Sequence, residues 1–345
     1  MNDGVHSRYQ RPSGDRLVDD FIGVRGVMEP ERLEALARRS DARGLAQLAS
    51  HAGAIAVTVW MMELSWGTWG CVPFFLLQGL LLNYVYAPQH ECSHYTAFKS
   101  RWINVWVGRL CGFINLYPND YHRWNHFTHH RHTQDWDKDP ELAVRDVFRT
   151  PGQYLLELTG WPATWGRFAN SWRQALLGKA DDWFLTDAQR RQVILASRWQ
   201  VAGYVAVLAS AIFWHSWWPL YFWIGPYLCM RWTYWLEGLG EHTWLTHEPN
   251  TLLNTRILKT NQFMRWLNWN MNHHSVHHTF PNVPFFRLPQ LYREVEARVG
   301  FELPGDPYLK LHWRHLKAML AGASELDLCA KESERVAGHS IDMKR

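Results

Sequence analysis

Residues 121–133 read YHRWNHFTHHRHT and hold five histidines. Three of them, His126, His129 and His130, form an H-x-x-H-H pattern. In a helix, residues three and four positions apart lie on one face. The spacing therefore predicts a helix whose three imidazoles converge on a common point.

Two further clusters extend this arrangement. The H-x-x-H-H pattern returns at His274, His277 and His278, and a shorter pair, His90 and His94, has i, i+4 spacing within H-E-C-S-H. Imidazole binds iron, zinc, copper and nickel. A zinc hydrolase site uses about three protein ligands, so eight clustered histidines exceed what one metal ion can use. We predict that they divide between two metal ions, with four or five ligands each.

Long uncharged runs accompany the histidines. Asp, Glu, Lys and Arg are absent from residues 44–62, 64–89 and 199–230, although the mean hydropathy of the whole chain is −0.32. A helix of roughly 20 apolar residues crosses a bilayer. These runs predict an all-α integral membrane protein. The net charge of +4, with no basic patch beside a recognition motif, excludes a nucleic-acid partner.

The runs form two helical hairpins in this interpretation. We expect membrane helices at about 45–63, 70–88, 194–213 and 218–236. A short uncharged turn at residues 65–70 separates the first pair. Pro219 interrupts the second run, which is too long for one crossing.

The distribution of arginine predicts the orientation. Residues 1–43 contain eight Arg, whereas the two outer turns contain neither Lys nor Arg. The positive-inside rule then places the N-terminus and every histidine cluster on the cytoplasmic face. Segments at about 100–118 and 153–176 are amphipathic and are expected to lie at the membrane interface.

The chain divides into three parts by this reasoning. Residues 1–43 form a cytosolic segment with a helix near 29–39 and a disordered start. Residues 44–300 form the membrane domain, whose four transmembrane helices carry a cytosolic helical cap with a di-metal site. Residues 301–345 hold a helix at about 307–321 and a polar tail that is expected to be disordered.

The ligand chemistry favours iron. Neutral imidazoles leave the positive charge of the metals uncompensated, which suits a reduced pair that binds oxygen-derived anions. We expect two non-haem Fe ions, with O2 as co-substrate, beside an apolar membrane bundle.

The three clusters resemble the histidine boxes of the membrane fatty acid desaturase and hydroxylase superfamily, which read H-x(3–4)-H, H-x(2–3)-H-H and H-x(2–3)-H-H. The third cluster lies in NHHSVHHTFPNVPFFRLP, similar to a family pattern that ends in H-H-x-F-P-x-x-P. The phrase H-H-R-H-T-Q, followed by D-P-E-L, is also desaturase-like. The resemblance covers about residues 45–300. It implies a four-helix bundle with a cytosolic cap, a di-iron centre and O2 as oxidant.

The resemblance also implies a ninth ligand, because family members recruit a histidine just after the fourth membrane helix. His242 occupies that place. The expected ligand set is His90, His94, His126, His129, His130, His242, His274, His277 and His278. His122 and Asn270 are expected to support ligands or a bound water rather than to bind metal.

Several other polar residues near the boxes are not expected to bind metal directly. An acidic loop contains Asp137, Asp139 and Glu141, which either orient ligands or are simply solvated. We expect no ligand role for four further histidines, namely His132, His273, His312 and His315, the last two being assigned to a surface helix.

An acyl-lipid desaturase is the favoured function. A lipid or carotenoid hydroxylase or ketolase of the same superfamily is the alternative, because the position of the substrate carbon decides between an alkene and an alcohol. Two non-redox alternatives are a metal transporter, with histidines buried along a membrane path, and a zinc hydrolase, since His90 to His94 spell H-E-x-x-H.

Each turnover requires two electrons from another protein. The sequence contains no H-P-G-G haem motif or flavin fingerprint, and its five cysteines form no C-x-x-C pair. The resemblance implies a ferredoxin-type or cytochrome-type carrier with its reductase, in addition to the lipid substrate.

Overall fold

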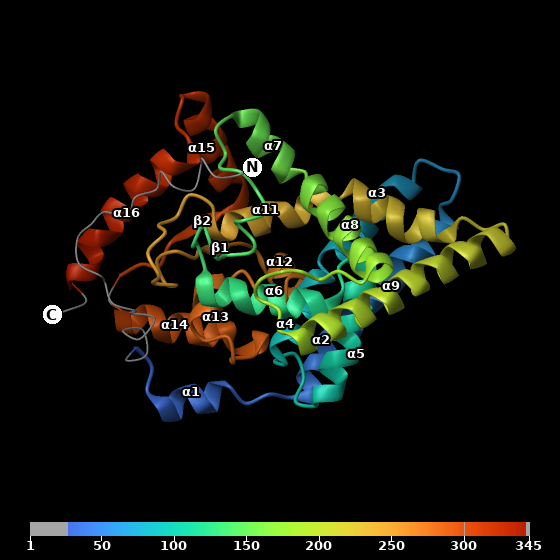
Figure 1. Ribbon diagram of the computed structural model, residues 1–345, viewed down its shortest axis with the longest axis horizontal. Coiled ribbons are helices and arrows are strands. Elements are labelled where there is room, and N and C mark those ends of the chain that lie inside the picture. The colour runs from blue at the N-terminus through green and yellow to red at the C-terminus, as the bar shows by residue number, and fades with distance from the viewer. Residues whose placement is uncertain (1–26, 300, 343–345) are drawn as a thin grey trace.

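The computed structural model describes residues 27–299 and 301–342, and side chains as far as residue 334 (Figure 1). This part of the chain is mostly helical. Two short parallel strands, β1 (Ile257–Lys259) and β2 (Gly305–Pro307), pair within it. The start of the N-terminal segment, for which disorder was predicted, lies outside the described residues.

The first expected hairpin is present. Helix α2 (Asp41–Leu64) is capped by Ser40, whose side chain accepts a hydrogen bond from the backbone N–H of Arg43. The returning arm consists of α3 (Cys71–Asn83) and α4 (Tyr86–His94). Both arms are long and apolar enough to cross a membrane, as is α9 (Asp187–Phe213). The described residues thus contain three candidate membrane spans.

The fourth expected span is not one continuous helix. It is divided into a π-helical segment η3 (Leu220–Ile224), α10 (Gly225–Cys229) and α11 (Arg231–His242). The predicted break near Pro219 does separate α9 from this segment, but the further interruption at Pro226 was not predicted. Because Pro226 has no N–H, it cannot donate to the carbonyl of Phe222. The side-chain amide of Gln78 on α3 donates to that carbonyl instead, at 3.0 Å.

Close backbone packing holds η3–α10 against α3. A Cβ added at Gly79 would lie 2.2 Å from the carbonyl oxygen of Pro226, so glycine is required at this crossing. One turn further along α3, Asn83 donates to the carbonyl of Tyr227 at 2.8 Å. The buried guanidinium of Arg231 donates to the side-chain oxygens of Asn83 at 3.0 Å and Thr164 at 2.8 Å.

Three helices lie where the expected interfacial segments were placed. They are α5 (Arg101–Ile114), α7 (Pro151–Leu158) and α8 (Trp161–Leu177). In Figure 1, α5 and α8 lie between the outer turns at the right and the cap at the left. Helix α5 exposes Trp102, Trp106 and Leu110, one residue per turn, which agrees with an apolar face toward lipid.

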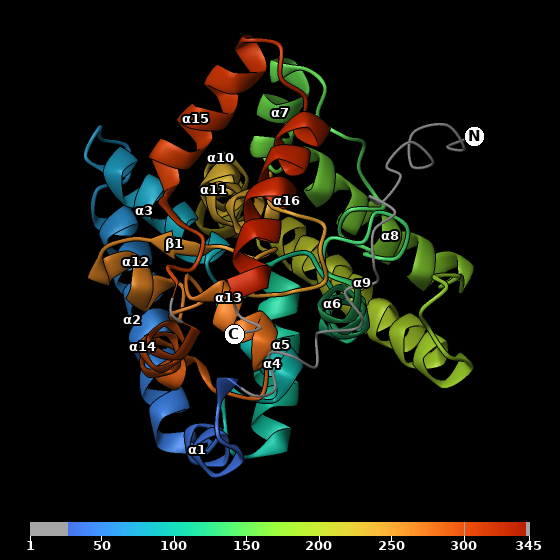
Figure 2. The same cartoon turned by 90° about the vertical axis from the view of Figure 1, so that its left-hand side faces the viewer.

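The cap consists of α6, α11 and the elements that follow α11 in the chain. Helix α6 (Asn119–His132) runs away from the bundle, and α13 (His274–Thr279) crosses nearby (Figures 1 and 2). The remaining elements are α1 (Pro30–Leu36), α12 (Gln262–Leu267), η4 (Phe285–Arg287), α14 (Leu288–Val299), α15 (Tyr308–Leu320) and α16 (Glu325–Asp342). An apolar core that includes Phe98, Trp269, Leu288 and Val295 joins α14 to the loops around α4.

The prediction of a disordered C-terminal tail is wrong. Residues 325–342 form α16 instead. The buried carboxylate of Glu325 pairs with Arg145 at 2.7 Å and accepts a hydrogen bond from the backbone N–H of Phe148 at 3.0 Å. A long-range ion pair therefore attaches this polar helix to the cap, which the local composition did not reveal.

Candidate metal centre

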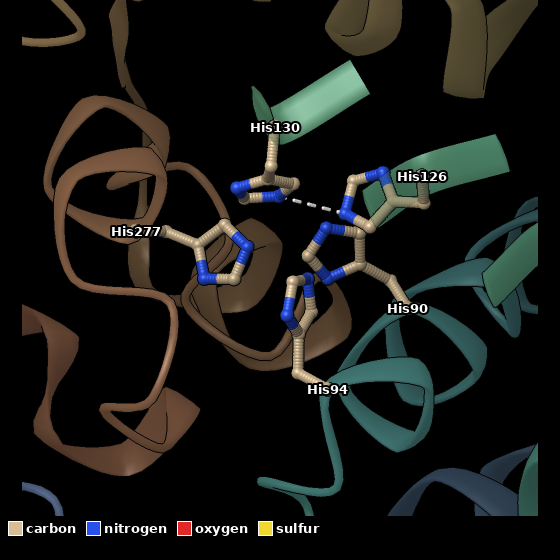
Figure 3. Close-up of side chains that lie close together, drawn as sticks. All are labelled: His90, His94, His126, His130 and His277. Atoms are coloured by element: carbon tan, nitrogen blue, oxygen red, sulfur yellow. Dashed lines mark hydrogen bonds between the residues drawn. The ribbon is translucent and has the colours of Figure 1, made fainter. Parts of the chain in front are cut away.

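The nine expected ligands meet in two groups within the cap. The five-histidine cluster consists of His90 and His94 from α4, His126 and His130 from α6, and His277 from α13. One ring nitrogen from each lies within 4.8 Å of those of the others. Figure 3 shows the five rings pointing toward one another.

The four-histidine cluster lies beside it. It consists of His129 from α6, His242 from α11, and His274 and His278 from α13. The rings of His130 and His278, one from each cluster, stack with centroids 4.0 Å apart. His242, expected on the resemblance alone, lies among these rings, 4.8 Å from that of His129.

Each H-x-x-H-H box contributes to both clusters, which corrects the expectation of one common point. On α6, His126 and His130 face the five-histidine cluster, whereas His129 faces the other. On α13 the division is reversed, because His274 and His278 face the four-histidine cluster and His277 does not. Around a helix axis, i+4 lies about 40° to one side of i and i+3 about 60° to the other, so i+3 and i+4 point about 100° apart. One box can therefore reach two centres.

Several ring nitrogens of the two clusters have no hydrogen-bond partner among the described residues, although Nε2 of His126 lies 2.9 Å from Nε2 of His130 and Nε2 of His274 lies 3.0 Å from Nε2 of His278. Both nitrogens of His90 and of His277 are buried without a hydrogen bond, as are Nε2 of His94 and of His242 and Nδ1 of His274. Buried polar atoms are normally paired. Unpaired imidazole nitrogens that converge from three or four helices fit a metal ion, and the clusters are compatible with the metal site that is typical of this donor set.

Burial also favours the protonation state that binds metal. Desolvation and the neighbouring imidazoles lower the pKa well below its usual value for His126, His130, His242, His274, His277 and His278. A histidine must be neutral to coordinate a metal ion. These rings are therefore neutral at physiological pH and available as ligands.

His129 is the exception, because a carboxylate lies behind it. Burial disfavours its charged form, but Asp139 and Glu141 outweigh this effect and raise its pKa to about 9. Asp139 lies 2.9 Å from Nδ1 of His129 and also accepts hydrogen bonds from the backbone N–H groups of Gln134 and Glu141. Asp139 is thus a buried orienting group and not a solvated loop residue.

The other two acidic residues of the loop differ from Asp139. Glu141 is half-buried, with its carboxylate 3.7 Å from Nδ1 of His126 and 3.9 Å from Nε2 of His129. Asp137 is exposed and makes no contact with the described histidines. A third carboxylate was not assigned a role from sequence, although it directly precedes His242. Glu241 lies 3.3 Å from Nδ1 of His274.

His122 and Asn270 lie outside both clusters. Nε2 of His122 lies 2.9 Å from the hydroxyl of Tyr86, and its Nδ1 lies 2.8 Å from Oγ of Ser93. Its ring stacks on that of His126 with centroids 5.2 Å apart, so it supports a ligand by packing. Asn270 donates to the carbonyl of Phe285 at 3.3 Å and belongs to neither cluster.

Four histidines without an expected ligand role are indeed outside the clusters. His132 lies beside Trp183, and His273 is buried against Tyr292. The assignment of His312 and His315 to a surface pattern is wrong, because both are buried around the hydroxyl of Tyr154.

A small cavity of about 40 Å³ adjoins both clusters. His90, His126, His129 and His274 form its metal-facing side. The remaining lining includes Tyr86, Glu141, Arg167, Tyr234, Trp235, Gly238 and Met271. The guanidinium of Arg167 lies over the ring of Tyr117 at 4.4 Å. Sequence analysis did not identify Arg167, since nothing in its local pattern distinguishes it from other arginines of an amphipathic helix.

Comparison with known proteins agrees with this geometry. Residues 67–309 match the family model described as fatty acid desaturase. An sn-1 acyl-lipid omega-3 desaturase (ferredoxin) of Nostoc sp. is 25% identical over 264 residues, or 70% of this chain and 72% of that protein. An sn-1 oleoyl-lipid 12-desaturase of Arthrospira platensis is 24% identical, covering 70% and 75%. A fatty acid desaturase of Bacillus subtilis is 22% identical, covering 58% and 60%.

The match includes the elements that carry all nine histidines, from α4 to α13. This chain belongs to the fatty acid desaturase family.

Proposed function

We propose that the protein is an O2-dependent, di-iron membrane oxidase that introduces a C=C bond into a lipid-linked acyl chain. The two histidine clusters carry this proposal, because five and four imidazoles provide ligands for two metal ions side by side. The printed names of the Nostoc and Arthrospira relatives support an acyl-lipid substrate.

The nine histidines would hold the metals, and a bound pair of iron ions would supply the redox chemistry that reduces O2 and removes two hydrogen atoms. The overall reaction balances as –CH2–CH2– + O2 + 2 e⁻ + 2 H⁺ → –CH=CH– + 2 H2O. The protein's own contribution is to orient the acyl carbons and to exclude bulk water. The cavity lined by Tyr86, Tyr234 and Trp235 is the place we assign to the reacting carbons, because it borders both clusters.

The geometry of Glu91 argues against the zinc hydrolase reading of H-E-C-S-H. In that reading Glu91 would act as a general base beside the metal. Its Oε2 instead accepts hydrogen bonds from the hydroxyl of Thr96 at 2.9 Å and from the backbone N–H of Phe285 at 3.1 Å. Glu91 thereby joins the end of α4 to η4, a structural task.

Lipid analysis of an expressing strain tests the proposal. A host that lacks desaturases should accumulate acyl chains with a new double bond when it expresses this protein. A new alcohol in place of the alkene would support the hydroxylase alternative. His277→Ala should abolish the product while the protein still inserts into the membrane, because His277 is a ligand of the five-histidine cluster in this account.

A further inference from the structure

His94 is the most accessible of the nine clustered histidines. The other eight are buried, whereas His94 is half-buried at the C-terminal end of α4. The adjacent residue, Tyr95, has a left-handed backbone with φ of 58° and ends the helix. The ring of Phe127 from α6 lies 5.4 Å from that of His94. His94 is therefore the clustered histidine with the largest exposed fraction, while its Nε2 is buried.

Two arginine side chains lie at this point. The guanidinium of Arg123 lies 3.6 Å from the ring centre of Tyr95 and 4.9 Å from that of Phe127. The guanidinium of Arg101 lies 4.8 Å from the same Tyr95 ring. We call these two arginines, the neighbouring Lys99, and Arg131 further along α6 the basic surface.

Helix geometry extends the basic surface along α6. Arg123, Phe127 and Arg131 follow one another at i, i+4 and i+8, so they form one stripe on the helix. Eight residues of helix span about 12 Å. The stripe therefore runs from the level of α5 toward the cap, in the direction that α6 takes in Figure 1.

Nearby carboxylates offset the charge of the basic surface only in part. Among the described residues, no ion pair links a carboxylate to any of its four cations. Two carboxylates lie close enough to interact with two of these cations, Asp41 with Lys99 and Asp120 with Arg123, but their short contacts are with other groups. Asp120 pairs with Arg109 at 3.0 Å, and Asp41 accepts hydrogen bonds from the N–H and hydroxyl of Ser100. Nε and Nη1 of Arg123 are buried without a hydrogen-bond partner.

We infer that the basic surface is the docking site of the electron donor, a small acidic redox protein of the ferredoxin type. This inference rests on the proposed function, which needs two electrons per turnover from outside the chain. Two successive one-electron transfers, each oxidising one donor, meet that requirement. The relatives whose printed names include ferredoxin support this class of donor. Opposite charges accelerate such an encounter and select the partner.

The position of the basic surface favours a protein over a lipid headgroup. The apolar face of α5, with Trp102 and Trp106, is the part that we assign to the bilayer. Arg131 lies at the far end of α6, beyond that level. A docked protein that contacts both Arg101 and Arg131 extends from the start of α5 to the last turn of α6.

Charge reversal at two exposed positions tests the docking site. Arg101 begins α5 and Arg131 lies in the last turn of α6, and both are exposed. A matched control reverses Lys310 and Lys317, which are exposed in the first and last turns of α15 on the opposite side of the cap. The two double variants therefore change the net charge equally and at equivalent helix positions.

The measurement is the Kd of a negatively charged [2Fe–2S] ferredoxin for the full chain in nanodiscs, at low and high salt. We expect R101E/R131E to raise the Kd on the order of tenfold or more at low salt, and to weaken its salt dependence. K310E/K317E should change the Kd by less than about twofold, because exposed charges far from the contact contribute little. Iron content and thermal midpoint should match the wild type in both variants.

Two results would overturn the docking site. One is equal Kd values for the wild type and R101E/R131E, and the other is the same loss in the α15 control. Nanodiscs with and without anionic lipid test whether the basic surface binds a lipid headgroup instead. In that case R101E/R131E would change the thermal midpoint only with anionic lipid, and the Kd for ferredoxin would equal that of the wild type. Donor binding without any alkene product would refute the proposed function and leave the docking site standing.

Discussion

Asp139 lies 2.9 Å from Nδ1 of His129, so the carboxylate accepts the Nδ1–H and leaves Nε2 free to face the four-histidine cluster. Backbone N–H groups of Gln134 and Glu141 hold the carboxylate in place. Such carboxylate–histidine pairs fix the tautomer and the ring orientation of metal ligands.

Replacing Asp139 should lower the metal affinity of the four-histidine cluster and leave that of the five-histidine cluster unchanged. Asp139→Asn removes the acceptor of His129, and losing such a partner weakens metal affinity about 10–100-fold. Dialysis against a chelator should then lower the iron content toward one ion per chain. Asp137→Asn, in the same loop but exposed, is the control and should retain the wild-type content. Equal retention of iron in both variants would show that the hydrogen bond between Asp139 and His129 is not needed for iron binding.

The cavity beside the clusters makes a prediction about substrate access. Gly238 lines it, and a Cβ there would meet only ordinary contacts with Tyr234 at 3.6 Å or more. Gly238→Leu should fill the cavity without disturbing the fold, and should reduce alkene formation at least about tenfold with normal iron content. Gly166→Leu, where a Cβ would meet nothing within 4 Å, controls for an added side chain. Full activity of Gly238→Leu would show that the reacting carbons of the acyl chain do not bind in this cavity.

The crossing of α3 and α10 should be intolerant of any side chain. Gly79→Ala places a methyl group against the backbone oxygen of Pro226, which cannot move independently. Overpacking of this kind costs about 1–3 kcal/mol. The thermal midpoint in detergent should fall, whereas Gly53→Ala on α2, with open space around the added methyl, should leave it unchanged or raise it. Equal midpoints for the two variants would contradict the tight crossing.

Acid should release α1 from the cap. Glu294 on α14 binds Arg32 on α1, with Nε of Arg32 at 2.9 Å, and this pairing lowers the pKa of Glu294 below its usual value. Because the pKa of Glu294 is lower in the folded protein than its unfolded value near 4.5, the pairing stabilises the fold at pH values above 4.5. This stabilisation is lost as the pH falls through the pKa of Glu294 in the folded protein. The protection factors of the α1 amides, which are corrected for the pH dependence of intrinsic exchange, should therefore fall from pH 6 to pH 3, and Glu294→Gln should remove this dependence. An unchanged profile in that variant would assign the effect to another group.

The membrane helices and the three histidine boxes were predictable from composition and spacing, and His242 from the family resemblance. The uncharged runs predicted α2, α3–α4 and α9, and the nine histidines expected as ligands all lie in the two clusters. Their division was not predictable from one box, because His129 and His130 are neighbours in sequence but face different centres.

The failures involve contacts between distant residues. The broken fourth segment depends on Pro226 and on Gln78, which lies on another helix. The ordered α16 depends on the pair of Glu325 with Arg145, 180 residues away. The role of Asp139 depends on a loop fold that composition describes only as acidic.

Metal analysis of the purified protein tests the central claim most directly. The full chain, extracted in mild detergent, should contain two irons per chain, and its Mössbauer spectrum in the oxidised form should show an antiferromagnetically coupled pair. One zinc per chain with no iron would contradict the di-iron assignment and favour a hydrolase or a transporter.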